Sequence, residues 1–225
     1  MALRTVESRL RGKTVLITGA SSGIGRSTAF EFARASPDDL RLVLVARRID
    51  RLARISEEIA EVVGLGVKIF ALELDVSDPA QACNILNRLP VEFKEVDVLV
   101  NNAGLARGVA KAPDIQQADI NSMMLTNVNG LINITQAILP AFLRRGNGGR
   151  GDIINIGSVA GREPYATASV YCASKAAVRA FTDSIRRELC DTRIRVIEID
   201  PGQVETEFSI VRLYGDESKA AGVYQ

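Results

Sequence analysis

The sequence predicts an α/β fold built on a doubly wound parallel sheet. Six short runs of β-branched and apolar residues recur along the chain, and stretches with helical spacing separate them. This alternation is typical of a parallel sheet covered by helices on both faces. Clusters of glycine, asparagine, serine and arginine follow the strands, at the edge where such sheets bind ligands. We expect three layers, at least six strands and one dinucleotide-binding and catalytic domain over residues 1–225.

The composition limits the classes of function. The chain has 225 residues, 47% of them hydrophobic, and a net charge of +1. These values indicate a soluble globular protein with one sizeable core. No long run of one charge sign is present, so we expect neither nucleic acid nor a membrane as a partner. Residues 1–11 lack the apolar core of a secretory signal, and the most apolar run, 131–143, is too short to span a bilayer and predicts a buried helix.

Histidine is absent from the sequence, which excludes Ser-His-Asp and Cys-His catalysis and the commonest metal ligand. Acid–base chemistry would therefore use Tyr, Lys, Asp or Glu. The three cysteines, Cys83, Cys172 and Cys190, lie far apart without CxxC spacing. We expect no metal site and no disulfide framework, and a reducing, cytoplasmic location.

The first strand, Val15–Ile17, runs into a glycine-rich turn, Thr18–Gly25, and a helix follows. Gly19 permits a tight turn, Gly23 lets the backbone approach a ligand, and Gly25 lets the helix pack against its strand. Free amides at the helix N-terminus are suited to a diphosphate. The spacing is GxxxGxG and not the usual GxGxxG, so a turn without a ligand is the alternative.

The second strand, Leu42–Ala46, is followed by Arg47 and Arg48. At this position an acidic residue selects a free ribose 2′-hydroxyl, whereas arginine accommodates a 2′-phosphate. The pair predicts that NADP is preferred over NAD and that Arg47→Ala weakens NADP far more than NAD. The alternative is that the arginines begin a solvated helix over Ile49–Val63.

The third strand, Val67–Leu74, ends at Asp75 and Val76, at the ligand-binding edge. Ser77 or Asp78 would cap the next helix, with Pro79 at its first position. Capping therefore explains that short segment without a function.

The fourth strand, Val96–Val100, leads to Ala103 and Gly104, which are small enough for a ligand to lie against the backbone; a polar turn is the alternative. A long helix follows over residues 117–145. Asn127 lies in its interior among residues that favour helix poorly. Residues that favour helix poorly inside a helix indicate a special role for the position. The alternative is a bend in which neighbouring backbone groups satisfy the hydrogen bonds of Asn127.

The last two strands are expected over Asp152–Ile156, after a glycine-rich loop at 146–151, and over Ile194–Ile199. Ser158 follows the fifth strand, and Pro201 and Gly202 follow the sixth. Both clusters fall at the ligand-binding edge of the sheet.

Tyr171 and Lys175 lie four residues apart on the intervening helix and therefore share a face. An ammonium beside the phenol favours the phenolate and lowers the tyrosine pKa from near 10. Tyr171 would then work as an acid and base. The alternative is an ordinary amphipathic helix, but the surrounding strand-end clusters favour a site.

These segments resemble the classical short-chain dehydrogenase/reductase family along essentially the whole chain. The resemblance implies a Rossmann-like fold and hydride transfer with NADP. It implies that Tyr171 is the acid–base, that Ser158 hydrogen-bonds the substrate oxygen, and that Lys175 binds the nicotinamide ribose and tunes Tyr171. Asn127 would support a relay water. The segments that carry it are Thr18–Gly25, Asn101–Gly104, Asn127, Ser158, Tyr171, Lys175, Pro201, Gly202, Val204 and Thr206.

The resemblance, together with the strand ends, implies an NADP site. The residues expected to bind the cofactor are Gly19, Ser21, Ser22, Gly23, Ile24, Gly25, Arg47, Arg48, Asp75, Val76, Asn102, Ala103, Gly104, Tyr171, Lys175, Pro201, Gly202, Val204 and Thr206.

Within the family, segments 161–165, 170–178 and 201–209 look most like NADP-dependent 3-hydroxy acid dehydrogenases, which oxidise serine and L-allo-threonine. Such substrates carry a carboxylate, so Arg162 and Arg212 are candidate pocket cations, and a solvated loop is the alternative for each. Tyr165 is close enough in the sequence to line the pocket, but packing is its expected role. Alternative functions are a 3-oxoacyl-carrier-protein reductase, a broad-specificity carbonyl reductase and a non-catalytic NADP-binding regulatory protein.

Family members continue beyond the sixth strand with a further helix and a seventh strand, whereas this chain stops at Gln225. We therefore expect a truncated C-terminal end that lacks the seventh strand. With the full C-terminus, a homo-oligomer, either tetramer or dimer, is expected.

Overall fold

The computed structural model describes residues 6–222, so both ends of the expected domain, including Gln225, lie outside the described residues. Within that range one six-stranded sheet has the order β3-β2-β1-β4-β5-β6, and all its pairings are parallel. The order reverses between β1 and β4, which confirms the doubly wound sheet. The strands are β1 Lys13–Thr18, β2 Leu40–Ala46, β3 Val67–Glu73, β4 Val98–Asn101, β5 Gly151–Ile156 and β6 Ile194–Ile199.

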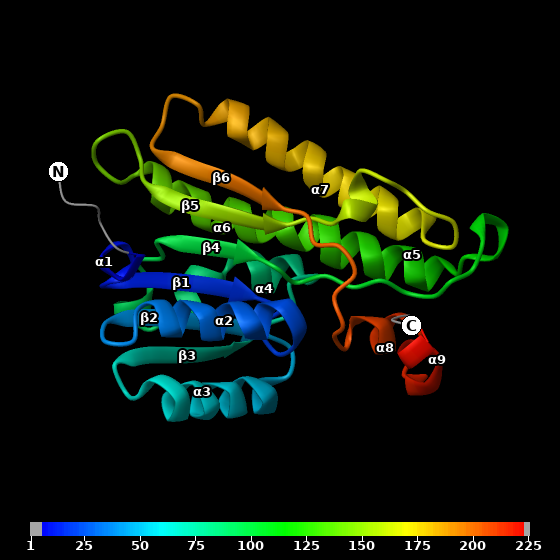
Figure 1. Cartoon of the computed structure of the whole chain (residues 1–225). Helices are drawn as coiled ribbons and strands as arrows, with labels where there is room; N and C mark the ends of the chain where they lie inside the picture. Colours follow the sequence, from blue (N-terminus) through cyan, green and yellow to red (C-terminus); the bar gives the residue numbers. More distant parts are fainter. Residues whose placement is uncertain (1–5, 223–225) are drawn as a thin grey trace.

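Helices cover both faces of the sheet and complete the three layers (Figure 1). One face packs against α2 and α3, and the other packs against α4, α6 and α7. The α-helices are α1 Val6–Leu10, α2 Gly23–Ala35, α3 Ile49–Val63, α4 Pro79–Cys83, α5 Gln117–Met124, α6 Leu131–Leu143, α7 Ser169–Glu188, α8 Phe208–Arg212 and α9 Glu217–Ala221. Short 3-10 turns lie at Ile85–Arg88, Val91–Phe93, Ala112–Asp114 and Val159–Gly161, and a π-helix lies at Leu125–Gly130.

Two hydrophobic cores, one on each face, hold the layers together. Along β1, Val15 and Ile17 pack in the core under α2 and α3, whereas Leu16 packs in the core under α6 and α7. Alternate side chains of a strand point to opposite faces. A strand buried on both faces needs apolar residues at every position, which explains the continuous apolar runs of the sequence.

The helix expected over residues 117–145 is interrupted by the π-helix Leu125–Gly130, so the structure corrects that single element to α5, the π-helix and α6. Single π turns inside helices often lie at functional sites. The glycine-rich loop expected to end at Gly151 is also one residue shorter, because Gly151 begins β5 and the Phe142 ring packs directly on it.

The expected cap of α4 is confirmed. The Asp78 carboxylate accepts hydrogen bonds from the backbone N–H groups of Ala80 and Gln81, with Pro79 at the first helical position. The cap explains this segment without a ligand. Among residues 6–222, no helix combines the length and apolar character needed to cross a membrane.

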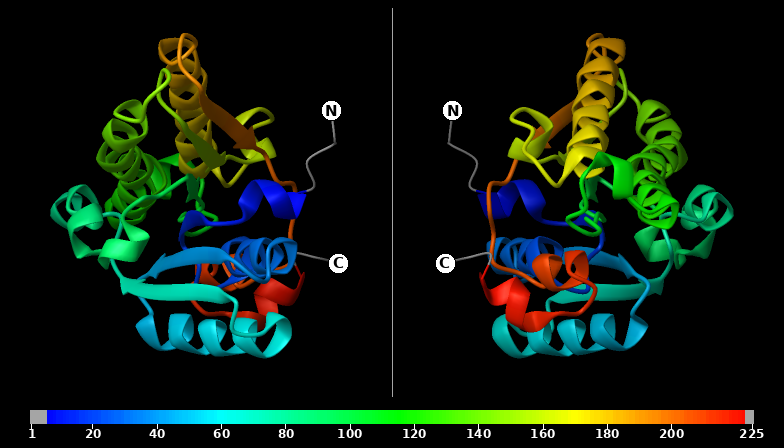
Figure 2. Two further views of the ribbon diagram at one scale, coloured as in Figure 1. Left: turned by 90° about the vertical axis from the view of Figure 1, so that its left-hand side faces the viewer. Right: turned by 90° about the vertical axis from the view of Figure 1, so that its right-hand side faces the viewer.

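Helices α8 and α9 lie beyond the carboxyl ends of the strands, the edge at which ligands bind in such sheets (Figure 1). The right-hand view of Figure 2 looks onto this edge, with α8 and α9 between the half of the fold that carries α7 and the half that carries α3. The segment that follows β6 therefore bridges the two halves at the predicted site.

Candidate active site

A cavity of about 670 Å³ lies along the carboxyl ends of the strands, under the segment that carries α8. Its volume is within the range of roughly 300–1,000 Å³ that is usual for small-molecule and cofactor pockets. Every expected cofactor-binding residue except Gly25 lines it, as do Ser158, Tyr171 and Lys175. The structure thus brings the strand-end clusters together, and the role of each residue in binding stays a prediction.

The glycine turn forms one end of the cavity. Gly19 has φ +66°, a left-handed conformation that favours glycine, and a Cβ there would lie 2.8 Å from the Cα of Ala103. Gly25 lies behind the cavity wall, where a Cβ would collide with Asn102. The Asn102 amide donates hydrogen bonds to the carbonyls of Thr18 at 2.9 Å and Gly19 at 3.2 Å. β4 therefore braces the turn, and Gly25 serves close packing.

The two arginines after β2 have different surroundings. Arg48 donates hydrogen bonds from Nη2 to the hydroxyls of Ser21 at 3.0 Å and Ser22 at 3.1 Å. The Arg47 side chain is 64% exposed and lies 3.9 Å from the Asp75 carboxylate. Both line the cavity, but Arg48 and the two hydroxyls form the compact donor group. Donors of this kind fit a phosphate.

Tyr171 and Lys175 are both buried at the other end of the cavity. The Lys175 Nζ donates a 2.8 Å hydrogen bond to the Ile156 carbonyl and lies 6.0 Å from the centre of the Tyr171 ring. Burial lowers the pKa of Lys175 to about 8, although Asp200 and Glu198 act in the opposite direction.

The pKa of Tyr171 corrects the sequence-based expectation. Burial raises this pKa, and it outweighs the lowering effects of a hydrogen bond with Ser158 and of the Arg212 charge. The net shift is thus opposite to the lowering expected from Lys175. A raised pKa keeps the phenol protonated at neutral pH, as a proton donor to an oxygen requires.

Ser158 is held from two sides. Its N–H donates to the Asp200 carboxylate at 3.0 Å, and its hydroxyl accepts a hydrogen bond from the N–H of Ala160 at 3.2 Å. Asp200 directly follows β6, so the ends of β5 and β6 together fix Ser158 beside Tyr171.

Asn127 does not line the cavity. Its side chain accepts from the Leu105 N–H and donates to the Leu105 carbonyl, both at 2.8 Å, and donates to the Ser174 hydroxyl at 3.0 Å. A Cβ on Gly104 would lie 3.3 Å from the Asn127 Oδ1 and 3.6 Å from the Lys175 Nζ. Neighbouring backbone therefore satisfies Asn127, as one interpretation expected, while the relay-water role stays a prediction.

Of the two candidate carboxylate-binding arginines, only one lines the cavity. Arg162 does not line the cavity; its Nε donates to Asp200 at 2.6 Å and its Nη2 lies 3.7 Å from Glu198. Its expected pocket role is therefore wrong, because Glu198 of β6 and Asp200 directly after that strand already hold it. Arg212 lines the cavity, and so does Tyr165, for which packing was expected.

Several cavity-lining residues were not among the predicted site residues. Phe208 lies edge-on to the Tyr171 ring with centroids 5.5 Å apart, and Glu207 pairs with Arg48. The Ile156 carbonyl accepts from Lys175. Glu207 and Phe208 belong to the segment 201–209 that carries the family resemblance, but their contacts could not be predicted because their partners lie far away in the sequence.

The donor set fits the expected cofactor. The N-terminus of α2 begins at Gly23, where free amide groups favour phosphate. Arg48 with its two serines lies at that end, and the hydroxyls of Ser158 and Tyr171 lie at the other. A dinucleotide with an extra phosphate at one end and a reacting ring at the other matches this distribution.

Comparisons with known proteins agree with this geometry. Residues 13–212 match the model of the short chain dehydrogenase family. The chain is 49% identical over 218 residues to an NADP-dependent 3-hydroxy acid dehydrogenase of Schizosaccharomyces pombe, covering 97% of this chain and 82% of that protein. It is 42% identical over 211 residues to sulfoacetaldehyde reductase 2 of Chromohalobacter salexigens, covering 94% and 80%. A closed serine dehydrogenase complexed with NADP+ superposes with a TM-score of 0.83 at 40% identity, covering 94% of this chain and 81% of that one.

Proposed function

The chain belongs to the short chain dehydrogenase family, and we propose that it is an NADP-dependent oxidoreductase acting on the 3-hydroxyl of small hydroxy acids such as serine or L-allo-threonine. The observation that carries the proposal is the buried group of Ser158, Tyr171 and Lys175 at one end of a cavity that has Arg48 at the other. Relatives named 3-hydroxy acid dehydrogenase and serine 3-dehydrogenase support the substrate class.

The chain's own residues handle the proton and the charge on oxygen. Bound NADP would supply or accept the hydride. Tyr171 gives its proton to the carbonyl oxygen in reduction and takes it from the hydroxyl in oxidation. Ser158 donates a second hydrogen bond to the same oxygen. Two donors aimed at an oxygen that gains negative charge stabilise the transition state more than the ground state.

Lys175 and Asn127 would act behind this pair. The Lys175 ammonium would hold the nicotinamide ribose, and Asn127, which flanks Gly104 together with Lys175, would hold the relay water. Arg48, Ser21 and Ser22 would bind the 2′-phosphate, with Arg47 at the edge of the same group.

The test follows the absorbance of the reduced cofactor, with NADP or NAD and a panel of L-serine, L-allo-threonine, 3-hydroxybutyrate and simple secondary alcohols. NADP should be preferred and the hydroxy acids should react. Tyr171→Phe should abolish nearly all turnover while NADP still binds. Full activity in that variant would rule out its acid–base role, and silence of the wild type with NADP bound would favour a non-catalytic binding protein.

The setting of the protein is part of the same proposal. We propose one domain, a cytoplasmic location and a homo-oligomer, either tetramer or dimer. One sheet with helices on both faces supports the single domain. The three free cysteines support a reducing compartment such as the cytoplasm. Light scattering on the purified protein measures the assembly.

A further inference from the structure

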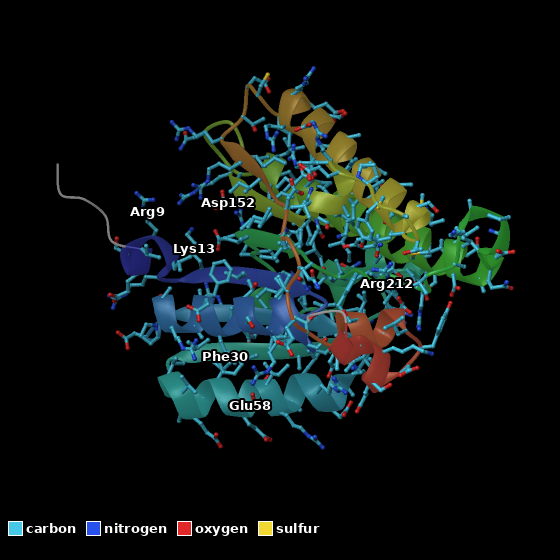
Figure 3. The ribbon with its side chains drawn as sticks, turned by 45° about the vertical axis from the view of Figure 1, so that its right-hand side comes forward. Arg9, Lys13, Phe30, Glu58, Asp152 and Arg212 are labelled. Carbon is cyan, nitrogen blue, oxygen red and sulfur yellow. The ribbon has the colours of Figure 1, made fainter. Side chains whose placement is uncertain are left out.

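Arg212 is the last residue of α8 and lines the cavity together with Tyr171. Figure 3 shows it at the end of α8 that lies nearest the half of the fold carrying α7. Burial raises the pKa of the Tyr171 phenol, and the positive charge of Arg212 acts against that shift. The guanidinium is therefore close to the group proposed to handle the substrate oxygen.

Four basic side chains line the cavity among the described residues: Arg47, Arg48, Lys175 and Arg212. The first two lie at the glycine-turn end, and each faces a carboxylate, Asp75 and Glu207 respectively. The Lys175 ammonium donates to the Ile156 carbonyl. Within residues 6–222, Arg212 is in no ion pair, so it is the cavity arginine whose charge has no carboxylate partner.

The hydrogen bonds of Arg212 use only some of its N–H groups. Nε donates to the Gly108 carbonyl at 3.2 Å, Nη1 to the Tyr165 hydroxyl at 3.3 Å, and Nη2 to the Thr167 carbonyl at 3.1 Å. Guanidinium has five N–H groups, so in the described part of the chain one N–H on each terminal nitrogen remains. These contacts fix the plane of the group, and a planar fork matches a carboxylate with two parallel hydrogen bonds.

We propose that Arg212 binds the carboxylate of the substrate and so sets the preference for small hydroxy acids; this inference rests on the proposed function. A 3-hydroxy acid carries its carboxylate two carbons from the carbon that bears the hydroxyl. The anchor must therefore lie close to Tyr171, as Arg212 does. A half-buried cation gains most from an anion that enters the same low-dielectric site.

The experiment compares one substrate with its neutral counterpart, 3-hydroxybutyrate and its methyl ester, in the wild type, Arg212→Ala and Arg212→Lys. Arg212→Ala should lower kcat/KM for the acid about 100-fold, mainly through KM, as expected for loss of a charge-assisted pair. The methyl ester has no carboxylate to pair with Arg212, so its kcat/KM should change by less than about threefold. Arg212→Lys should recover part of the loss, and the Kd of NADP should stay unchanged in both variants.

Arg107→Ala is the matched control. Arg107 donates from Nη1 to the Val211 carbonyl at 3.1 Å and lies 5.8 Å from the Tyr214 ring, so it also steadies α8, but it does not line the large cavity. Its loss should affect acid and ester alike. An equal loss of kcat/KM for both substrates in Arg212→Ala would mean that Arg212 only supports α8. This result would overturn the inference but leave the proposed oxidoreductase function intact.

A binding measurement separates this inference from the proposed function. Calorimetric titration of NADP-loaded Tyr171→Phe, in which turnover should not consume the ligand, with 3-hydroxybutyrate should give a Kd that adding Arg212→Ala raises about 100-fold, by the same loss of a charge-assisted pair. If the protein binds the acid through Arg212 but turns over no substrate, the anchor stands and the oxidoreductase proposal falls. If the Kd does not change, the anchor is wrong whatever the activity.

Discussion

The Glu207 carboxylate accepts a 3.1 Å hydrogen bond from Arg48, which lies 159 residues earlier in the chain, and pairs with Arg51 as well. Glu207 directly precedes α8, whereas Arg48 follows β2 and also donates to Ser21 and Ser22. A carboxylate of the C-terminal segment therefore occupies the guanidinium proposed for the 2′-phosphate. Burial acts to raise the pKa of Glu207, but hydrogen bonds and charges from the two arginines outweigh it and lower this pKa, so Glu207 is ionised at neutral pH.

Glu207→Gln should strengthen NADP binding and leave NAD binding unchanged, because it removes a negative charge that competes for Arg48. The gain should be roughly threefold to fivefold, since partly exposed ion pairs are worth at most about 1 kcal/mol. Fluorescence titration with NADPH and NADH measures both affinities. Weaker NADPH binding in the variant would show that Glu207 instead helps to hold the segment over the bound cofactor.

Arg48→Ala should lower kcat/KM for NADP by about 10- to 100-fold with little effect on NAD, the loss expected for a charged hydrogen-bonding partner. Arg47→Ala should weaken NADP binding less, because the Arg47 side chain is mostly exposed and lies 3.9 Å from the Asp75 carboxylate. The two variants assayed with both cofactors rank the arginines. A larger loss in Arg47→Ala would mean that Arg47, the residue for which the sequence analysis predicted the effect, makes the main contact with the 2′-phosphate.

Elements with a strong local signal were predicted at their observed bounds. The helix Ile49–Val63 begins after a strand end and shows clear amphipathic spacing, and Ile194–Ile199 is a β-branched run. The π-helix was not predicted, although the unusual Asn127 marked its position. A π turn depends on one extra residue per turn and on the Leu105 backbone that Asn127 binds, and spacing along the chain does not encode that contact.

Some features of the candidate site could likewise be predicted from the sequence, and others could not. Residues at strand ends share one edge by topology alone, so their gathering followed from the sequence. The pairs Glu207–Arg48 and Phe208–Tyr171 depend on how the segment after β6 folds back. The pKa of Tyr171 depends on burial, which neighbours in the sequence do not reveal, and for that reason its direction was wrong.

Asn127→Ala should destabilise the fold by about 3 kcal/mol, because it leaves the buried N–H and C=O of Leu105 unpaired and each such group costs roughly 1–3 kcal/mol. Asn129→Ala is the matched control, since Asn129 lies in the same π-helix but is exposed, and its loss should cost less than about 0.5 kcal/mol. Urea unfolding of both variants gives the two values. Equal destabilisation would mean that the π-helix, and not the Leu105 pairing, sets the stability here.

Lys175→Met should change how stability depends on pH. Burial lowers the pKa of Lys175 from 10.5 to about 8, so between these values the unfolded chain holds a proton that the folded chain lacks. Stability contributed by this group therefore rises with pH across that window. Below it both states are charged, and the folded protein carries the full cost of the buried ammonium.

The free energy of unfolding of the wild type should thus rise relative to Lys175→Met by about 2 kcal/mol between pH 7 and pH 10, from 1.36 kcal/mol per unit of pKa shift. Urea unfolding without cofactor at several pH values measures the difference. The loss of the hydrogen bond to Ile156 shifts the whole curve of the variant but does not alter this slope. Parallel curves would mean that Lys175 keeps an ordinary pKa, and that water reaches its ammonium in the free protein.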